Sequence, residues 1–144
     1  MKQIIENIKK NRNKIIFSIL AIVILIGFNI INDRQKLLHS FLIELANDFN
    51  KDLPLIVNSE TRFDYTKALS RNKFGYYYTL LLETYDEINV EEFTDYIKPN
   101  LLIHAKDNAY HLNFIPLKVT QVYIFNDKNG IEIISYEIKP KELK

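Results

Sequence analysis

The sequence predicts an α+β fold: a single N-terminal transmembrane helix, then a two-layer domain with helices packed on an antiparallel sheet of about four to five strands. Three observations predict it. An uncharged apolar run occupies residues 15–31, several later segments alternate like strands, and two segments repeat apolar residues at helical spacing. Helices and strands are grouped along the chain, which favours a two-layer arrangement. The 144 residues suffice for an anchor and one small domain.

The apolar run is interpreted as an uncleaved membrane anchor. Residues 15–31 read IIFSILAIVILIGFNII and carry no charge. At about 1.5 Å per residue they cover roughly 25 Å, close to the ~30 Å hydrocarbon core of a bilayer. The run is longer than the apolar region of a signal peptide, and GFNIINDRQ after it offers no small-x-small cleavage site. We therefore expect contact with the lipid bilayer through Ile15–Ile31.

The charges that flank the run predict its orientation. Five basic residues precede it against one acidic residue, Glu6, whereas Asp33, Arg34 and Lys36 nearly balance after it. The positive-inside rule then makes residues 1–14 a basic cytoplasmic N-terminus, 15–32 the transmembrane helix and 33–144 an extracytoplasmic α+β domain. The expected location is the inner (plasma) membrane of a bacterium, with a single pass.

Composition excludes several classes of function. There is no cysteine, which excludes a thiolate nucleophile, a Cys-ligated zinc site, disulfides and a lipid-modified cysteine. Beyond residue 14 acidic residues outnumber basic ones, so binding to nucleic acid is not expected.

A helix is predicted to continue from the span over residues 33–50, because no Pro or Gly separates the two segments. Its apolar stripe recurs at steps of three and four residues: Leu38, Phe41, Leu42, Leu45 and Phe49. We expect it to pack on the domain's own sheet and to cover the face that carries Tyr76 and Tyr78. Homodimerisation through Leu38, Leu42, Leu45 and Phe49 is the alternative, although two heptads are too few to hold a coiled coil alone.

The remaining elements follow from turn and capping signals. Leu53-Pro54 ends the helix, and strands are predicted over residues 54–57, 62–69 and 74–83, the last apolar on both faces and therefore central. Asn89 caps a helix, with Glu92 returning the hydrogen bond, and Pro99 interrupts or kinks it. Residues 119–125 and 131–138 form a closing hairpin, for which Asn129-Gly130 predicts a type I′ turn.

The segment LPLIVNSETRFDY and the strand YYYTL resemble a family of small bacterial exported proteins. Their pattern is Leu-Pro-x-x-Val-Asp-x-x-Thr, then a Tyr-x-Tyr strand, then a hairpin ending in Asp-x-x-Gly. The matching positions are Leu53, Pro54, Val57, Thr61, Tyr76, Tyr78, Asp127 and Gly130, whereas Asn58 replaces the Asp of the pattern. The resemblance implies export and this fold, and it implies no activity.

Several groups of polar residues have plainer interpretations than catalysis. His104 and His111, with Asp107, lack a recognised zinc spacing, and Ser70-x-x-Lys73 lacks the partner motifs of serine acyltransferases. Asp127-x-Asn129-Gly130 is a fragment of a calcium loop that fits a hairpin turn better. We therefore predict no catalytic residue, no metal ligand and no cofactor.

An acidic run and a polar cluster remain. The acidic run comprises Glu83, Asp86, Glu87, Glu91, Glu92 and Asp95. It suits the start of a helix, and a cation site or a dock for a basic partner is the alternative. The cluster Asn58, Thr61, Arg62 and Asp64 has a structural interpretation, in which Arg62 pairs with Asp64 or caps backbone carbonyls.

The sequence thus favours a non-enzymatic, membrane-anchored module of the bacterial envelope that binds a protein partner. Its candidate interaction surface comprises Asn58, Thr61, Arg62, Asp64, Tyr76 and Tyr78. The alternative is an envelope hydrolase or a small-ligand-binding domain that uses the segment Asn58–Asp64. A concave pocket lined by Arg62, Tyr76 and Tyr78 would favour the alternative, and a flat, exposed aromatic patch would favour the protein-binding module.

Overall fold

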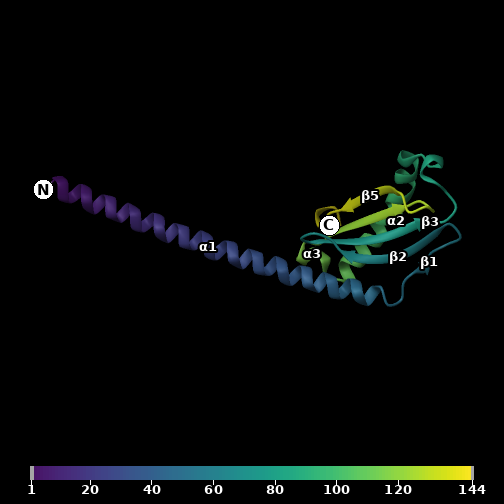
Figure 1. Ribbon diagram of the computed structural model, residues 1–144, viewed down its shortest axis with the longest axis horizontal. Coiled ribbons are helices and arrows are strands. Elements are labelled where there is room, and N and C mark those ends of the chain that lie inside the picture. The colour runs from purple at the N-terminus through teal and green to yellow at the C-terminus, as the bar shows by residue number, and fades with distance from the viewer. Residues whose placement is uncertain (1, 144) are drawn as a thin grey trace. The chain divides into compact units, whose positions relative to one another are not determined.

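A computed structural model describes residues 2–143, and their side chains from Phe17 onward (Figure 1). The chain forms two units that divide between Leu37 and Leu38, and each is described by itself. The first unit is the N-terminal part of α1 (Lys2–Phe49), a single continuous helix. By length and composition, the helix Phe17–Phe49 can cross a membrane, since an 18-residue stretch of it has a mean hydropathy of 1.7. The side chains of the basic residues at positions 1–14 lie outside the described part.

The second unit contains a five-stranded sheet in the order β1-β2-β3-β4-β5. The strands are β1 (Leu55–Ile56), β2 (Thr61–Ala68), β3 (Lys73–Leu80), β4 (Thr120–Asn126) and β5 (Glu132–Ile138). The helices are the end of α1, then η1 (Tyr85–Glu87), α2 (Val90–His111), α3 (Phe114–Leu117) and η2 (Pro140–Leu143). The predicted α+β class, with its long apolar helix at the N-terminus, is confirmed.

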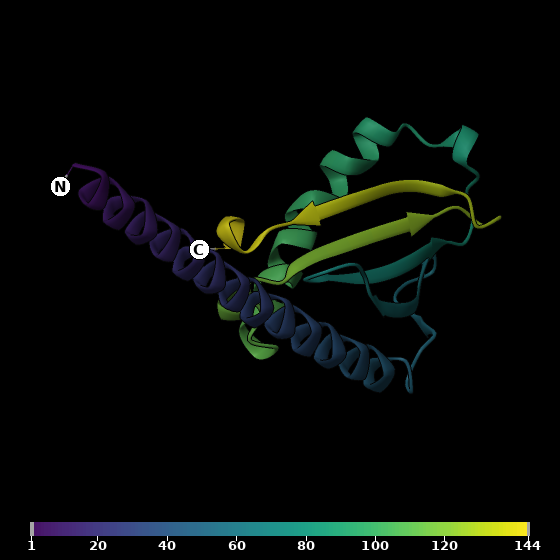
Figure 2. The ribbon, with the colours of Figure 1, turned by 60° about the vertical axis from the view of Figure 1, so that its left-hand side comes forward.

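The sheet is mixed, so the prediction of an entirely antiparallel sheet is wrong at one place. β1/β2, β2/β3 and β4/β5 are antiparallel, whereas β3 and β4 are parallel, with Lys73 opposite Thr120 and Thr79 opposite Asn126. Parallel neighbours need a long crossover connection, and α2 supplies it by returning the chain to the end of the sheet at which β3 begins. Figure 2 shows α2 along one face of the sheet.

Helix α2 begins as predicted but does not stop at Pro99. The Asn89 Oδ1 atom accepts hydrogen bonds from the backbone N–H groups of Glu91 and Glu92, at 3.1 and 3.3 Å. The helix runs unbroken to His111, so the predicted interruption is wrong. Pro99 and Asp95 are both exposed, and water can therefore satisfy the Asp95 carbonyl that proline leaves without a partner.

The turn between β4 and β5 is built around Asp127 and is not the predicted type I′ turn. That turn needs positive φ at both central residues, and here only Gly130 has it, at 84°. The Asp127 carboxylate accepts hydrogen bonds from the N–H groups of Asn129 (2.8 Å), Ile131 (2.8 Å) and Tyr85 (3.0 Å). Burial raises the pKa of this carboxyl, but the backbone hydrogen bonds outweigh burial and hold the pKa below its ordinary value. Asp127 thereby ties the hairpin to η1.

The last turns of α1 dock on the aromatic face of the sheet. Leu42 is fully buried, and Leu38, Leu45 and Phe49 pack half-buried on the same core, which confirms packing on the domain's own sheet. Phe41 is 40% exposed, so the prediction that it helps to cover the sheet is wrong. Homodimerisation through the stripe remains a prediction.

Asn50, the residue after α1, holds this end of the helix to β2. Its side-chain amide donates to the carbonyl of Thr66 at 2.9 Å and accepts from the Thr66 N–H at 2.7 Å. The amide thus pairs with Thr66 as the backbone of a neighbouring strand would. The Thr66 hydroxyl is also 3.3 Å from the carbonyl oxygen of Ala46.

Leu42→Ala tests whether the end of α1 belongs to the core of the domain. Truncating a fully buried leucine is expected to lower the free energy of unfolding by about 2–5 kcal/mol. Ile43→Ala is the matched control, because Ile43 is the next residue and is 43% exposed. Its expected cost is below about 1 kcal/mol. Urea unfolding of the detergent-solubilised protein checks both, and equal losses would contradict this packing.

Candidate functional site

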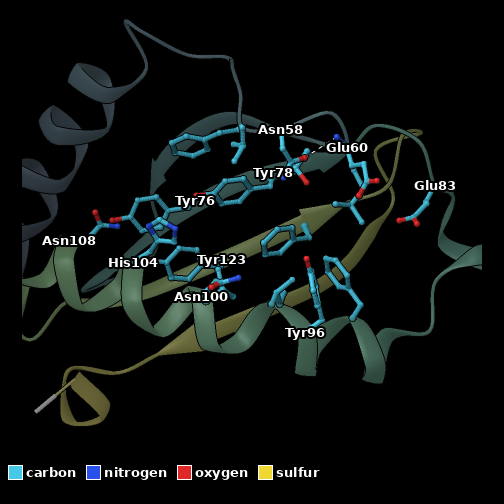
Figure 3. Close-up of a pocket in the computed structure, with 18 of the residues that line it drawn as sticks. Asn58, Glu60, Tyr76, Tyr78, Glu83, Tyr96, Asn100, His104, Asn108 and Tyr123 are labelled. Carbon is cyan, nitrogen blue, oxygen red and sulfur yellow. Dashed lines mark hydrogen bonds between the residues drawn. The ribbon is translucent and has the colours of Figure 1, made fainter.

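A cleft of about 710 Å³ lies between α2 and the sheet, within the second unit (Figure 3). Strands β2, β3 and β4 supply its floor, α2 supplies one wall, and Phe49 with the segment around β1 supplies the other. The volume falls within the range typical of ligand-binding pockets, roughly 300–1,000 Å³. About twenty side chains line it, and most of the floor is aromatic.

The floor consists of two rows of stacked rings that run across the strands. In the first row Tyr78 of β3 stacks on Phe63 of β2 and Phe125 of β4, with ring centroids 4.7 and 5.0 Å apart. In the second row Tyr76 stacks on Tyr123 at 4.9 Å. Each stacked pair sits on directly opposed residues of neighbouring strands, so the register of the sheet creates the floor.

Helix α2 presents two different rows of side chains to this region. The residues Phe93, Ile97, Leu101 and Ala105 pack on the core. A second, polar row lines the cleft, and its members come one residue before the positions of the first row: Glu92, Tyr96, Asn100, His104 and Asn108. Both rows repeat every four residues, which places each row along one side of a helix. The wall therefore offers hydrogen-bonding groups above an aromatic floor.

The mouth of the cleft carries negative charge. Three carboxylates line it, from Glu60, Glu83 and Glu92, and the described lining residues include neither Lys nor Arg. Glu60 is positioned by Asn58, whose Oδ1 atom accepts a hydrogen bond from the Glu60 N–H at 2.9 Å. The site thus combines an apolar, aromatic floor with an acidic rim.

The tyrosine hydroxyls of the floor are neutral hydrogen-bonding groups at physiological pH. Burial raises the pKa of Tyr78 to about 12, and it raises the pKa values of Tyr76 and Tyr123 as well. A tyrosinate base or nucleophile is therefore not available here. The floor can donate hydrogen bonds and cover apolar surface.

Tyr76 and Tyr123 differ in how their hydroxyls are satisfied. Tyr123 donates to the Gln121 Oε1 atom at 3.1 Å, and the Gln121 Nε2 group donates to the Ala105 carbonyl at 2.7 Å, which ties β4 to α2. Tyr76 is 3% exposed, and its buried hydroxyl makes no hydrogen bond of normal geometry with the described residues, although the Asn108 side chain lies near enough to act on the pKa of this hydroxyl. Figure 3 shows Tyr76 in the cleft, on the side of Asn108. A buried hydroxyl without a partner is costly, which makes this oxygen a natural contact for a ligand.

The structure brings together four of the six residues of the predicted interaction surface. Asn58, Thr61, Tyr76 and Tyr78 line the cleft, whereas Arg62 and Asp64 do not. Strand side chains alternate between faces, and Arg62 lies opposite Thr79, on the face away from Tyr78.

The ion pair predicted for Arg62 forms on this other face. The Arg62 Nε group contacts the Asp64 carboxylate, which also accepts a hydrogen bond from the Thr79 hydroxyl at 2.6 Å. A register shift between Phe63 and Tyr65 leaves Asp64 free to make both contacts. The structural interpretation of this pair is confirmed.

Sequence reasoning missed the polar row of α2 and the rings contributed by β4. The row is visible in the sequence as polar residues every four positions, whereas the pairing of β4 with β3 is not. Of the histidines considered as ligands, His104 lines the cleft and His111 pairs with Asp107, Nε2 to Oδ1, at 3.6 Å. The described residues contain no group of three metal-binding side chains.

No protein-family model matches the sequence, and no curated protein matches it. Three solved structures share the fold. One is a protein of Pseudomonas aeruginosa classed as secreted, with a TM-score of 0.66 and 11% identity over 77% of this chain and 96% of that one. The others are type II secretion system pilotins: EpsS of Vibrio vulnificus (TM-score 0.59, 11% identity) and AspS of Vibrio cholerae (0.58, 9%). Each of these comparisons covers 78% of this chain and 97% of the pilotin.

Tyr76→Phe tests whether the Tyr76 hydroxyl is needed for folding. Because this hydroxyl makes no hydrogen bond of normal geometry, its removal is expected to leave the free energy of unfolding unchanged or to raise it by about 1 kcal/mol. Tyr123→Phe is the matched control, since it removes a buried hydrogen bond and is expected to cost about 1 kcal/mol. Urea unfolding of both variants measures the difference. A clear loss of stability in Tyr76→Phe would mean that the hydroxyl serves the fold.

Proposed function

We propose that this protein is a membrane-anchored module of the bacterial envelope whose extracytoplasmic domain binds a segment of another protein in the cleft. The observation that carries the proposal is the cleft itself, an aromatic floor beside a polar helix wall with an acidic rim. Aromatic side chains supply a large part of the energy in protein recognition. The fold, shared with type II secretion pilotins, supports an accessory role in the envelope.

The chemistry of the cleft suggests what the bound segment carries. Its apolar side chains would lie over the rings of Tyr78 and Phe125, and its polar groups would face Asn100 and Asn108. A lysine or arginine near Glu60, Glu83 and Glu92 would complement the acidic rim. A dock for a basic partner was the alternative interpretation of the acidic run, and two residues of that run, Glu83 and Glu92, belong to this rim.

The anchor and its orientation are the second part of the proposal. The uncharged run from Ile15 to Ile31 suits a single span, and the five basic residues before it favour a cytoplasmic N-terminus. The domain from residue 33 onward would then lie outside the cytoplasm, attached to the inner membrane.

A small ligand is the second candidate occupant of the cleft. The volume of about 710 Å³ and the unpartnered hydroxyl of Tyr76 favour it. The proposed hydrolase alternative is weaker, because Arg62 and Asp64 of the segment Asn58–Asp64 are held in an ion pair on the other face.

Reporter fusions after Lys144 test the orientation. A reporter that requires export, such as alkaline phosphatase, is expected to be active there, and a cytoplasmic reporter inactive. Neutralising Lys9, Lys10, Arg12 and Lys14 is expected to lower the export activity, because these charges hold the N-terminus inside. The control neutralises Lys98 and Lys106, far from the span. Activity of the cytoplasmic reporter at this junction would overturn the proposed location.

Photo-crosslinking in living cells tests the cleft. A photoreactive phenylalanine analogue replaces Tyr96, which lines the cleft and is 77% exposed, or Tyr110, a control on the same helix that is 80% exposed and outside the cleft. We expect one discrete envelope protein to be captured at position 96 and not at position 110. Replacing Glu60, Glu83 and Glu92 by lysine is expected to abolish the adduct.

Mass spectrometry of the adduct is expected to find a peptide that combines apolar side chains with Lys or Arg. Absence of a protein adduct at position 96, together with a small molecule that co-purifies with the native protein and is lost from the Tyr76→Phe variant, would favour the second candidate.

A further inference from the structure

The domain separates its charges along the direction of the strands. At one end lie four exposed basic residues, which we call the basic end: Arg71, Lys118, Lys139 and Lys141. At the other end lie the carboxylates of the cleft mouth and of the segment that leads into α2: Glu60, Glu83, Asp86, Glu87, Glu91 and Glu92. Strands of seven or eight residues hold the two ends roughly 25 Å apart.

Hydrogen bonds join two of the segments that form the basic end, the β2–β3 turn and the start of β4. The Asn72 side chain donates to the carbonyl of Lys118, and the Thr120 N–H donates to the carbonyl of Asn72 at 2.9 Å. A shallow hollow of about 550 Å³ is lined by Asn72, Ile115, Pro116, Lys118, Thr120, Lys139, Pro140 and Lys141. Figures 1 and 2 both show α3 and the C-terminal turn at this end of the sheet.

The cations of the basic end are free to bind an external group. None of the four makes an ion pair among residues 17–143, whereas the neighbouring Lys73 is paired with Glu137. Glu142 is the nearby carboxylate, and it is occupied in accepting a hydrogen bond from the Lys139 N–H at 2.8 Å. Apolar side chains lie beside the lysines, among them Leu117 of α3, which is 39% exposed.

Two of the four cations stand where glycine would be easier to accommodate. Arg71 and Lys118 have φ angles of 63° and 55°, in the left-handed region that disfavours side chains. Strained backbone that carries a charged, exposed side chain is often associated with a functional surface.

Few residues separate the predicted span from the second unit. The predicted span ends at Ile31, and Leu38 begins the second unit. The six residues between them cover only about 10 Å as helix. A charged membrane surface acts over a similar distance, since the Debye length at physiological ionic strength is about 8 Å. Phe49 of α1 contacts Phe74 near the start of β3, and Phe74 contacts Phe114 of α3, with ring centroids 6.2 and 5.7 Å apart. The end of α1 within the second unit therefore packs on the part of the core that adjoins the basic end.

We propose that the basic end binds the anionic phospholipid headgroups of the membrane that holds the anchor, and so turns the acidic mouth of the cleft away from the bilayer. The proposal rests on the anchor of the proposed function. Lysines beside exposed apolar side chains are the combination that interfacial segments use, with the charges on the headgroups and the apolar groups at the acyl boundary. The occupied surface is distinct from the cleft, which stays open for its partner.

The absence of cysteine allows a direct test in the full-length protein. Ser70→Cys, in the turn beside Arg71, and Asn129→Cys, in the turn at the other end of the sheet, each provide a single site for a fluorescent label. Each labelled protein is placed, one copy per disc, in nanodiscs that contain a quencher attached to the lipid headgroup. The discs contain either phosphatidylcholine alone or roughly 30% phosphatidylglycerol, a typical anionic fraction.

The label at position 70 is expected to be quenched about threefold more in the anionic discs than in neutral discs, and the label at position 129 equally little in both. About 1 M NaCl, which shortens the Debye length to about 3 Å, is expected to remove the difference. Replacing Lys118, Lys139 and Lys141 by glutamate, or by glutamine as a milder variant, is also expected to remove it. Thermal unfolding checks that these exposed substitutions leave the fold intact.

The outcomes separate this inference from the proposed function. If the protein enters the discs but both labels are quenched equally, or the difference in quenching does not depend on lipid charge, the basic end does not bind anionic headgroups. The proposed anchor is not contradicted by that result. If the label at position 70 is quenched only when several copies occupy a disc, the basic end binds the acidic mouth of a second copy instead. That result also overturns the inference. Protein that does not enter the discs at all overturns the anchor and with it the inference.

Discussion

A parallel pair of strands cannot be joined by a tight turn, and the connection from β3 to β4 here extends from Leu81 to Val119. That connection contains α2, which must lie along the sheet to carry the chain back to the start of β4. The cleft follows from this requirement, because α2 becomes its wall. The same pairing sets Tyr76 opposite Tyr123 and Tyr78 opposite Phe125, and so assembles the aromatic floor. The topology therefore creates the site more than any local motif does.

The end of α1 determines how much of the aromatic face stays open. Leu42 and Ala46 are buried, and the Asn50 amide pairs with the backbone of Thr66. These contacts fix the end of α1 on the sheet beside Thr66, which lies opposite Tyr76. Phe74 and Tyr76 become part of the core, whereas Tyr78, one row further along, remains half-buried and accessible from the cleft. One strand face thus contributes both to the packed core and to the open aromatic floor of the cleft.

Because β3 and β4 run in the same direction, the segments that precede both strands lie at one end of the sheet and the segments that follow both lie at the other. The β2–β3 turn, the start of β4 and the end of β5 bring basic residues to one end, and the loops before β2 and after β3 bring glutamates to the other. The domain as a whole is only mildly acidic, so this separation does not appear in its composition. It gives the two ends different chemistry, one suited to anionic lipid headgroups and one to a basic segment of a partner.

The sequence by itself determined the features that depend on neighbouring residues: the apolar run at 15–31, the helix that continues from it, the Asn89 cap and the positions of the main strands. It also predicted the aromatic rows in part, because Tyr76 and Tyr78 alternate on one strand, and it anticipated the Arg62–Asp64 pair. What it did not determine was the parallel pairing of β3 with β4, since alternation within a strand carries no information about which strand lies beside it. The tertiary structure alone decided that Arg62 and Asp64 face away from Tyr78, through the register that sets Arg62 opposite Thr79, and that the row from Glu92 to Asn108 meets the floor. Side-chain periodicity is a local property of the backbone, whereas a cleft requires segments that are distant in the sequence to meet.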